Sequence, residues 1–411
     1  MECAGGHVWQ CQTLSGALRV TAHTTGGDMS AAPAIENDKP RDEFGATAAP
    51  DNSASAVEQL SGRLMESVIG LAEVCTVYLG ERLGLYRTLA RTGPATTATV
   101  AHAAGVAPRY AQEWCEQQAV AGLLVVDDTA APAAERRYSL PPGHDAVLAD
   151  PESPAYLAPL GLMAAAISSG LPTLAEAFRT GAGVPYAAYG SSGREAQEAL
   201  NRSGFLGGMA GWVALLPDVE ERLRRPGARV LDVGCGCGWS SVALAKSFPE
   251  PYVVGVDIDQ PSLERGREIA VTEGVEDRVS FVQADATTRL DSLPAGGFDL
   301  VTVFEALHDT ARPGDVLAAL RRLVAPGGAL LVAEPAVEEQ FTAPAGPMER
   351  MNLASSVLFC LPTAMNGPAA EPTGAAMRPD LLRRLATAAG FRSMTILPAE
   401  HPMWRFFRLD S

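Results

Sequence analysis

The second half of the chain alternates between apolar strand-like runs and helix-like segments, and this alternation restricts the fold more than any other feature. Strands are expected at residues 229–234, 252–257, 279–285, 299–306 and 329–335. Helices are expected between them at 239–248, 261–273 and 313–324. Strands joined through helices by short turns pair in parallel and are covered on both faces. A further helix at 378–390 and strand-like runs at 391–399 and 404–410 predict an antiparallel hairpin at the end of this sheet.

The net charge restricts the kinds of partner that the protein can bind, and the cysteine usage indicates its cellular compartment. A formal net charge of −16 leaves no surplus of cations for a polyanion, so we expect no nucleic-acid partner and no membrane partner. The seven cysteines are odd in number and scattered, which predicts reduced thiols and a cytoplasmic protein without a signal peptide. The uncharged stretch 155–172 is interpreted as a buried helix because prolines and glycines interrupt it.

The composition also predicts four regions. Residues 1–55 lack periodicity and are expected to form a disordered tail, within which Met29 is an alternative start. Residues 56–150 read as helices followed by a two-stranded ribbon, the pattern of a winged helix-turn-helix. Its third short helix is slightly acidic, which favours a lid or dimerisation role over DNA binding. Residues 151–227 are expected to form a helical connector, and 228–411 the domain of alternating strands and helices.

The turn after the first strand of this domain, in "LDVGCGCGWSS", carries glycines at every second position. Gly234, Gly236 and Gly238 precede a helix, where the backbone must turn tightly and a ligand must approach closely. The second strand ends in Asp257, whose carboxylate can accept both hydroxyls of a ribose. The third strand ends in Asp285, which is placed to bind an adenine amino group.

Together these motifs resemble those of the class I S-adenosylmethionine-dependent methyltransferases. The resemblance implies a Rossmann-like seven-stranded sheet of order 3-2-1-4-5-7-6 with an antiparallel last strand, and S-adenosyl-L-methionine (SAM) as cofactor. It implies these cofactor-binding residues: Asp232, Gly234, Cys235, Gly236, Gly238, Asp257, Ile258, Asp285, Ala286 and Phe304. Beyond residue 56 the chain also resembles two-domain bacterial methyltransferases with an N-terminal winged-helix module, which implies a homodimer through the N-terminal helices.

The two cysteines of the glycine turn do not predict a metal site. One residue separates Cys235 from Cys237, which is tighter than the usual zinc spacing, and a second ligand pair is missing. We therefore expect no metal here, and sensitivity of these thiols to oxidation remains a hypothesis.

The stretch "VFEALHDTARP" follows the fourth strand, at the end of the sheet where reacting groups are expected. Plant-type small-molecule O-methyltransferases have His-Asp-Trp here, with the histidine as general base. His308 and Asp309 match this pattern, whereas Thr310 replaces the tryptophan. His308 is thus a candidate base, oriented by Glu305, Asp309 or Glu334, and the alternative is a histidine that caps a helix or shapes the pocket.

The segment after strand five breaks the alternation and is a candidate substrate pocket. We expect Met351, Asn352 and Ser355 to contact the substrate, although core packing or a dimer face would give the same pattern. Tyr186 and Tyr189 are open to the same alternatives.

The sequence as a whole predicts a SAM-dependent methyltransferase that acts on an O, N or C nucleophile of a small molecule such as a specialised metabolite. One alternative is a transcription regulator that senses the cofactor. The other is a metal-assisted C-methyltransferase of a 2-oxo acid, which would need a second histidine, and none lies between His308 and His401.

Overall fold

The computed structural model describes residues 53–286, 290, 293, 297–367 and 369–411. Most of the predicted tail, including Met29, lies outside these residues. Its last three residues, 53–55, already belong to the first helix, α1 (Ser53–Arg82).

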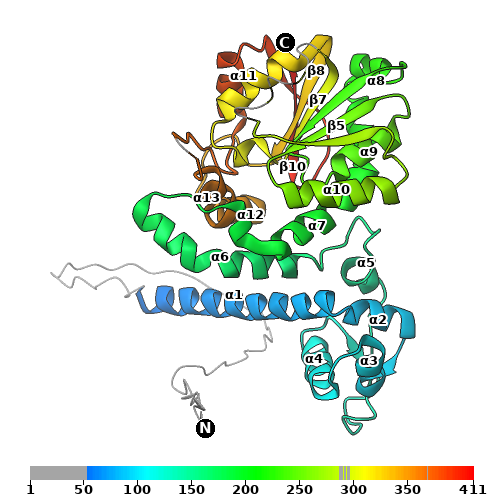
Figure 1. Ribbon diagram of the computed structural model, residues 1–411. Helices are drawn as coiled ribbons and strands as arrows, with labels where there is room; N and C mark the ends of the chain where they lie inside the picture. Colours follow the sequence, from blue (N-terminus) through cyan, green and yellow to red (C-terminus); the bar gives the residue numbers. More distant parts are fainter. Residues whose placement is uncertain (1–52, 287–289, 291–292, 294–296, 368) are drawn as a thin grey trace, which may run out of the picture. The chain divides into compact units, whose positions relative to one another are not determined.

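The C-terminal domain is built on the predicted seven-stranded sheet (Figure 1). Its strands are β4 (Arg229–Val233), β5 (Tyr252–Asp257), β6 (Val279–Gln283), β7 (Phe298–Phe304), β8 (Val324–Pro335), β9 (Ser393–Ile396) and β10 (Trp404–Asp410). Their order is β6-β5-β4-β7-β8-β10-β9, which confirms the predicted 3-2-1-4-5-7-6. The first five strands run parallel, and β10 pairs antiparallel with both β8 and β9.

Helices cover both faces of this sheet because alternate strand residues point to opposite sides. Val230 of β4 belongs to one core with residues of α9, whereas Leu231 and Val233 belong to a second core with residues of α11 and α14. The helices of this domain are α9 (Trp239–Ser247), α10 (Gln260–Thr272), α11 (Pro313–Leu323), α12 (Pro347–Ser355), α13 (Leu361–Ala364) and α14 (Pro379–Ala388). Two short turns complete it, the 3-10 helix η3 (Leu307–Asp309) and the π-helix η4 (Ser356–Cys360).

The winged-helix module has its own core. Its elements are α2 (Leu85–Thr92), β1 (Ala95–Thr96), α3 (Thr97–Ala104), α4 (Pro108–Val120), β2 (Val125–Val126) and β3 (Arg137–Ser139). The strands form a sheet of order β1-β3-β2, so a third short strand joins the predicted two-stranded ribbon. Tyr86 and Trp114 meet edge to face in the core, with 5.1 Å between ring centroids. Arg109, the basic residue of α4, forms an ion pair with Glu113, which leaves this helix with an acidic surplus.

The connector is helical, as its sequence predicts. It contains α6 (Leu160–Thr180), η1 (Tyr186–Tyr189), α7 (Gly190–Ala214) and α8 (Pro217–Leu223), after the short α5 (His144–Leu148). By length and composition α6 could cross a membrane, a test that core helices also pass. A Cβ atom at Gly161 would lie 2.6 Å from the backbone nitrogen of Tyr78, so this face of α6 packs closely against protein.

Candidate active site

The glycine turn between β4 and α9 leaves open space at one position only among its three glycines. Gly234, Gly236 and Gly238 have φ angles of 72°, 51° and 77°, in the left-handed region that favours glycine. A Cβ at Gly234 would lie 2.3 Å from that of Ala306, and one at Gly238 would lie 2.5 Å from the Phe281 ring. A Cβ at Gly236 would meet nothing within 4 Å. The outer two glycines therefore serve the packing of the protein, and Gly236 faces the space that a ligand can enter.

Asp232 lies beneath this turn rather than in the open space. Its carboxylate is buried and accepts hydrogen bonds from three hydroxyls, those of Ser240 (2.6 Å), Ser241 (2.6 Å) and Thr302 (2.8 Å). Burial raises the pKa of Asp232, and the three hydroxyl donors oppose that rise. The carboxylate therefore ties the start of α9 to β4 and β7, which fixes the path of the glycine turn.

Asp257, the last residue of the neighbouring strand β5, binds the backbone of the glycine turn. One carboxylate oxygen accepts from the backbone N–H of Gly236 and the other from that of Asp259, each at 2.8 Å. Burial raises the pKa of Asp257, and these backbone donors oppose the rise. The following Ile258 side chain is 64% exposed, an apolar surface directly beside the carboxylate. Arg194 of α7 forms a two-point ion pair with Asp259 at 2.6 and 2.9 Å, which holds this loop in place.

The remaining predicted cofactor residues fall into two groups. Asp285 and Ala286 are half-buried and follow β6, whose last residue, Gln283, pairs with Asp257 in the sheet register, so they lie at the same edge. Phe304, in contrast, is buried in an aromatic cluster with Phe205 and Trp212, at centroid distances of 5.5 and 6.1 Å.

The two thiols of the glycine turn are buried. Burial is the main cause that raises the pKa of Cys235 well above its ordinary value and that of Cys237 to about 12. Both are therefore thiols rather than reactive thiolates at neutral pH, which does not support the expected sensitivity to oxidation.

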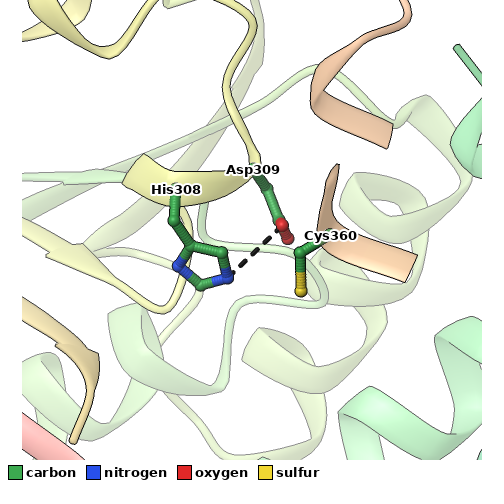
Figure 2. A group of neighbouring side chains, drawn as sticks. All are labelled: His308, Asp309 and Cys360. Atoms are coloured by element: carbon green, nitrogen blue, oxygen red, sulfur yellow. Dashed lines mark ion pairs between the residues drawn. The ribbon is translucent and has the colours of Figure 1, made fainter. Parts of the chain in front are cut away.

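His308 sits in η3, just after β7, between the carboxylates of Glu334 and Asp309. Figure 2 shows its ring beside Asp309 and Cys360. Its Nδ1 lies 2.6 Å from a carboxylate oxygen of Glu334, and its Nε2 lies 3.3 Å from Oδ1 of Asp309. Both His308 and Glu334 are buried. Burial lowers the pKa of His308, but the two carboxylates outweigh it and raise that pKa well above its usual value. Of the three acids expected to orient the ring, Glu334 makes the hydrogen bond.

Glu305 is the most unusual carboxyl group of the site. It follows β7 with a left-handed φ of 52°, a conformation that costs energy for a residue other than glycine. Burial raises its pKa to about 8, and the neighbouring Glu334 and Asp309 add to the rise. Its buried Oε1 has no hydrogen-bond partner among the described residues. Two further buried atoms of neighbouring carboxylates share that property, Asp309 Oδ1 and Glu334 Oε1. Unpaired buried polar atoms are rare, and this group fits a site that a ligand completes.

The predicted substrate residues lie on α12, which continues without a break into η4 and α13. Asn352 and Ser355 are half-buried, whereas Met351 is 58% exposed. The π-helical turn η4 ends at Cys360, whose sulfur lies near the side chains of His308 and Asp309. Sequence reasoning missed Cys360, because the chain gives no spacing signal for a contact formed only by folding.

The connector tyrosines contact the same turn. The Tyr189 hydroxyl donates a hydrogen bond to the carbonyl of Leu358 at 2.9 Å, and the Tyr186 ring meets Phe359 edge to face at 5.8 Å. Both tyrosines therefore serve to position η4.

Comparison with known families finds a match for two parts of the chain. Residues 224–361 match the family described as a methyltransferase domain, and residues 72–150 match the Rv2258c-like winged HTH domain. The chain contains a methyltransferase domain. This domain carries the glycine turn, Asp257 and His308, so the site described above lies within the methyltransferase domain.

Curated relatives match less than a third of the chain. The chain is 37% identical over 125 residues to the ubiquinone/menaquinone biosynthesis C-methyltransferase UbiE of Ectopseudomonas mendocina, covering 30% of this chain and 46% of the relative. It is 34% identical over 110 residues to the 27-O-demethylrifamycin SV methyltransferase of Amycolatopsis mediterranei, covering 27% and 39%. The chain thus spans less than half the length of these relatives.

Solved structures match over nearly the whole fold. Human N-acetylserotonin methyltransferase in complex with SAM has a TM-score of 0.62 at 18% identity, covering 90% of this chain and 99% of that one. The mitomycin 7-O-methyltransferase MmcR has a TM-score of 0.59 at 19% identity, covering 87% and 100%. At these identities the likeness establishes a shared two-domain fold.

Proposed function

We propose that this protein is a SAM-dependent methyltransferase that transfers a methyl group to a nucleophile of a small molecule. The observation that carries the proposal is the open space at Gly236 beside Asp257 and the exposed Ile258. Each oxygen of the Asp257 carboxylate accepts one backbone N–H and keeps a second lone pair, which suits a ribose diol, and an exposed branched side chain next to it suits the face of a purine.

The residues of the site fit SAM as a whole. Asp257 would hold the ribose hydroxyls, Ile258 the adenine face, and Asp285 with Ala286 the adenine edge. Gly236 would allow close approach of the ligand to the backbone. The bound cofactor supplies an electrophilic methyl group on a sulfonium. The solved neighbours support this choice, because human N-acetylserotonin methyltransferase was solved in complex with SAM and PigF with SAH.

His308 is our proposed proton acceptor in its neutral form, which the raised pKa of the ring confines to higher pH, so turnover should rise as the pH approaches that pKa. Glu334 holds the ring through Nδ1, so Nε2 is the ring atom that can face a substrate. Asp309 borders this nitrogen and can share the proton. Methyl transfer also depends on in-line placement of the nucleophile, and α12 with η4 would supply the surface that orients it.

The acceptor atom remains part of the proposal. The neighbours' names include O-methyltransferases and an amino-riboflavin N,N-dimethyltransferase, so the fold serves both oxygen and nitrogen acceptors. We further propose a cytoplasmic location, which rests on the cysteine usage.

The test is a transfer assay with SAM that carries a labelled methyl group. Purified protein is incubated with the small-molecule fraction of a cell extract, and the products are separated by mass spectrometry. We expect at least one small molecule to gain one labelled methyl group together with formation of S-adenosylhomocysteine (SAH). The protein is first shown to bind SAH. If it then forms neither a labelled product nor SAH with any of the extracts, the proposed activity is contradicted.

A further inference from the structure

His308, Asp309 and Cys360 bring three kinds of metal ligand together inside the protein. They come from η3 and from η4, two segments that are distant in the sequence (Figure 2). The histidine nitrogen, the carboxylate oxygen and the thiol sulfur all lie within 4.8 Å of one another. His308 and Cys360 are 3% and 8% exposed, so water competes little for this position.

The spacing fits a tetrahedral ion. With zinc–nitrogen and zinc–oxygen bonds of about 2.0–2.2 Å, two ligand atoms of a tetrahedron lie about 3.3–3.5 Å apart. The distance from His308 Nε2 to Asp309 Oδ1 is 3.3 Å, although the pair lacks hydrogen-bond geometry. In such a site the sulfur ligand lies about 3.5–3.6 Å from the nitrogen and the oxygen ligand. The Cys360 sulfur lies within 4.8 Å of both atoms, so it needs to move toward them by at most about 1.3 Å.

The surroundings of His308 match those of a metal-bound histidine. Such a ring usually donates its second N–H to a carboxylate, which fixes its orientation and leaves the other nitrogen for the metal. Glu334 accepts from Nδ1 of His308 at 2.6 Å, and Nε2 is the nitrogen that faces Asp309.

The π-helical turn fixes the third ligand. Single π-helical turns occur often at functional sites because they redirect side chains within a helix. The hydroxyl of Ser356 accepts from the backbone N–H of Ala375 at 3.1 Å, and Tyr189 donates to the carbonyl of Leu358. These bonds hold both halves of η4, and with them the direction of Cys360.

We propose that His308, Asp309 and Cys360 form a binding site for one divalent cation of the zinc type, with a fourth position open. The mixed nitrogen, oxygen and sulfur set suits Zn²⁺ or Co²⁺, whereas Mg²⁺ and Ca²⁺ need oxygen ligands. Coordination releases two protons to solvent, the thiol proton of Cys360 and, where the His308 ring is protonated, the proton on its Nε2. The sequence analysis expected no metal, because it weighed only the Cys235–Cys237 pair and a second histidine. The proposal rests on geometry alone and not on methyl transfer. Where His308 is the proton acceptor, bound metal occupies its Nε2 and inhibits the enzyme.

The experiment measures metal binding directly. The full-length protein is treated with a chelator, dialysed, and titrated with Co²⁺ and with Zn²⁺. We expect one ion per chain and a near-ultraviolet thiolate-to-cobalt charge-transfer band. Cys360→Ser removes this band and weakens Zn²⁺ binding at least about 100-fold, since loss of a ligand exceeds the 10–100-fold effect of outer partners. Glu334→Gln weakens binding about 10–100-fold and keeps the band.

Cys237→Ser is the matched control. Its thiol is equally buried, at 9% exposure against 8% for Cys360, and burial raises the pKa of both thiols to about 12. This variant should keep the band and the wild-type affinity, and circular dichroism confirms that each variant is folded. Absence of the band in wild-type protein, or its persistence in Cys360→Ser, would overturn the proposal. So would its loss in folded Cys237→Ser.

Discussion

Replacement of Gly236 by alanine separates the role of the glycine turn in ligand binding from its role in stability. The added Cβ meets nothing within 4 Å, so the cost to folding is the strain of a left-handed alanine, about 1–2 kcal/mol. In a chain of 411 residues that lowers Tm by about 1–2 °C. The same methyl group enters the space assigned to the cofactor, so we expect SAH affinity to fall at least about tenfold, which is ~1.4 kcal/mol.

Two further glycine variants complete this experiment. Gly227 also has a positive φ (81°) and open space around its Cβ position, but it lies before β4, away from the site. Gly227→Ala should lose the same stability and keep wild-type SAH affinity. Gly234→Ala adds the 2.3 Å contact with Ala306 and should cost about 2–5 kcal/mol, as strain and overpacking combine.

Calorimetry with SAH and thermal unfolding are measured on the same preparations. Unchanged SAH affinity in Gly236→Ala would refute the assignment of this open space to the cofactor. An equal affinity loss in Gly227→Ala would show that strain, and not occupied space, weakens binding.

Three further predictions concern catalysis, stability and assembly. His308→Asn should lower turnover at least about 100-fold and leave SAH affinity unchanged. If this variant turns over as fast as the wild type, His308 has only a structural role. Asp232→Ala removes the carboxylate that accepts from three buried hydroxyls, so the free energy of unfolding should fall by about 3–5 kcal/mol in chemical denaturation. A fall below about 1 kcal/mol would contradict the role of Asp232 under the turn. We also propose that the protein is a homodimer through α1, where Leu64 and Val68 are each 59% exposed. The double variant L64E/V68E should then be a monomer in analytical ultracentrifugation. A wild-type protein that sediments as a monomer would exclude the homodimer.

The sheet could be predicted from the sequence because its strands are short apolar runs with clear turns on either side. The largest difference at a single strand end is the start of β8, expected at residue 329 and found at Val324. The run "VAPGG" has the composition of a turn, but Val324 pairs with Phe298 of β7. A pairing between strands overrides local turn propensity there, and a single sequence does not show it.

The position of the glycine turn, Asp257 and Asp285 at one edge of the sheet could also be predicted, since they lie at strand ends that the alternation itself defines. The hydrogen bonds of Asp232 could not, because Ser240 and Thr302 reach it only once α9 and β7 pack. The left-handed backbone of Glu305 and the contact of Cys360 with His308 are products of tertiary packing as well. Local pattern therefore predicted which residues meet at one edge of the sheet, and packing decided how their side chains are paired.

The most direct test of the proposed function is calorimetric titration of the protein with SAM and SAH. The proposal predicts one site per chain, at least about a 100-fold affinity loss in Asp257→Ala, and a smaller loss in Asp257→Asn, which keeps one acceptor oxygen. Asp277→Ala, at an exposed turn after α10, should bind like the wild type. Wild-type protein that binds neither compound, or Asp257→Ala that binds both with unchanged affinity, would contradict the assignment of this site to SAM.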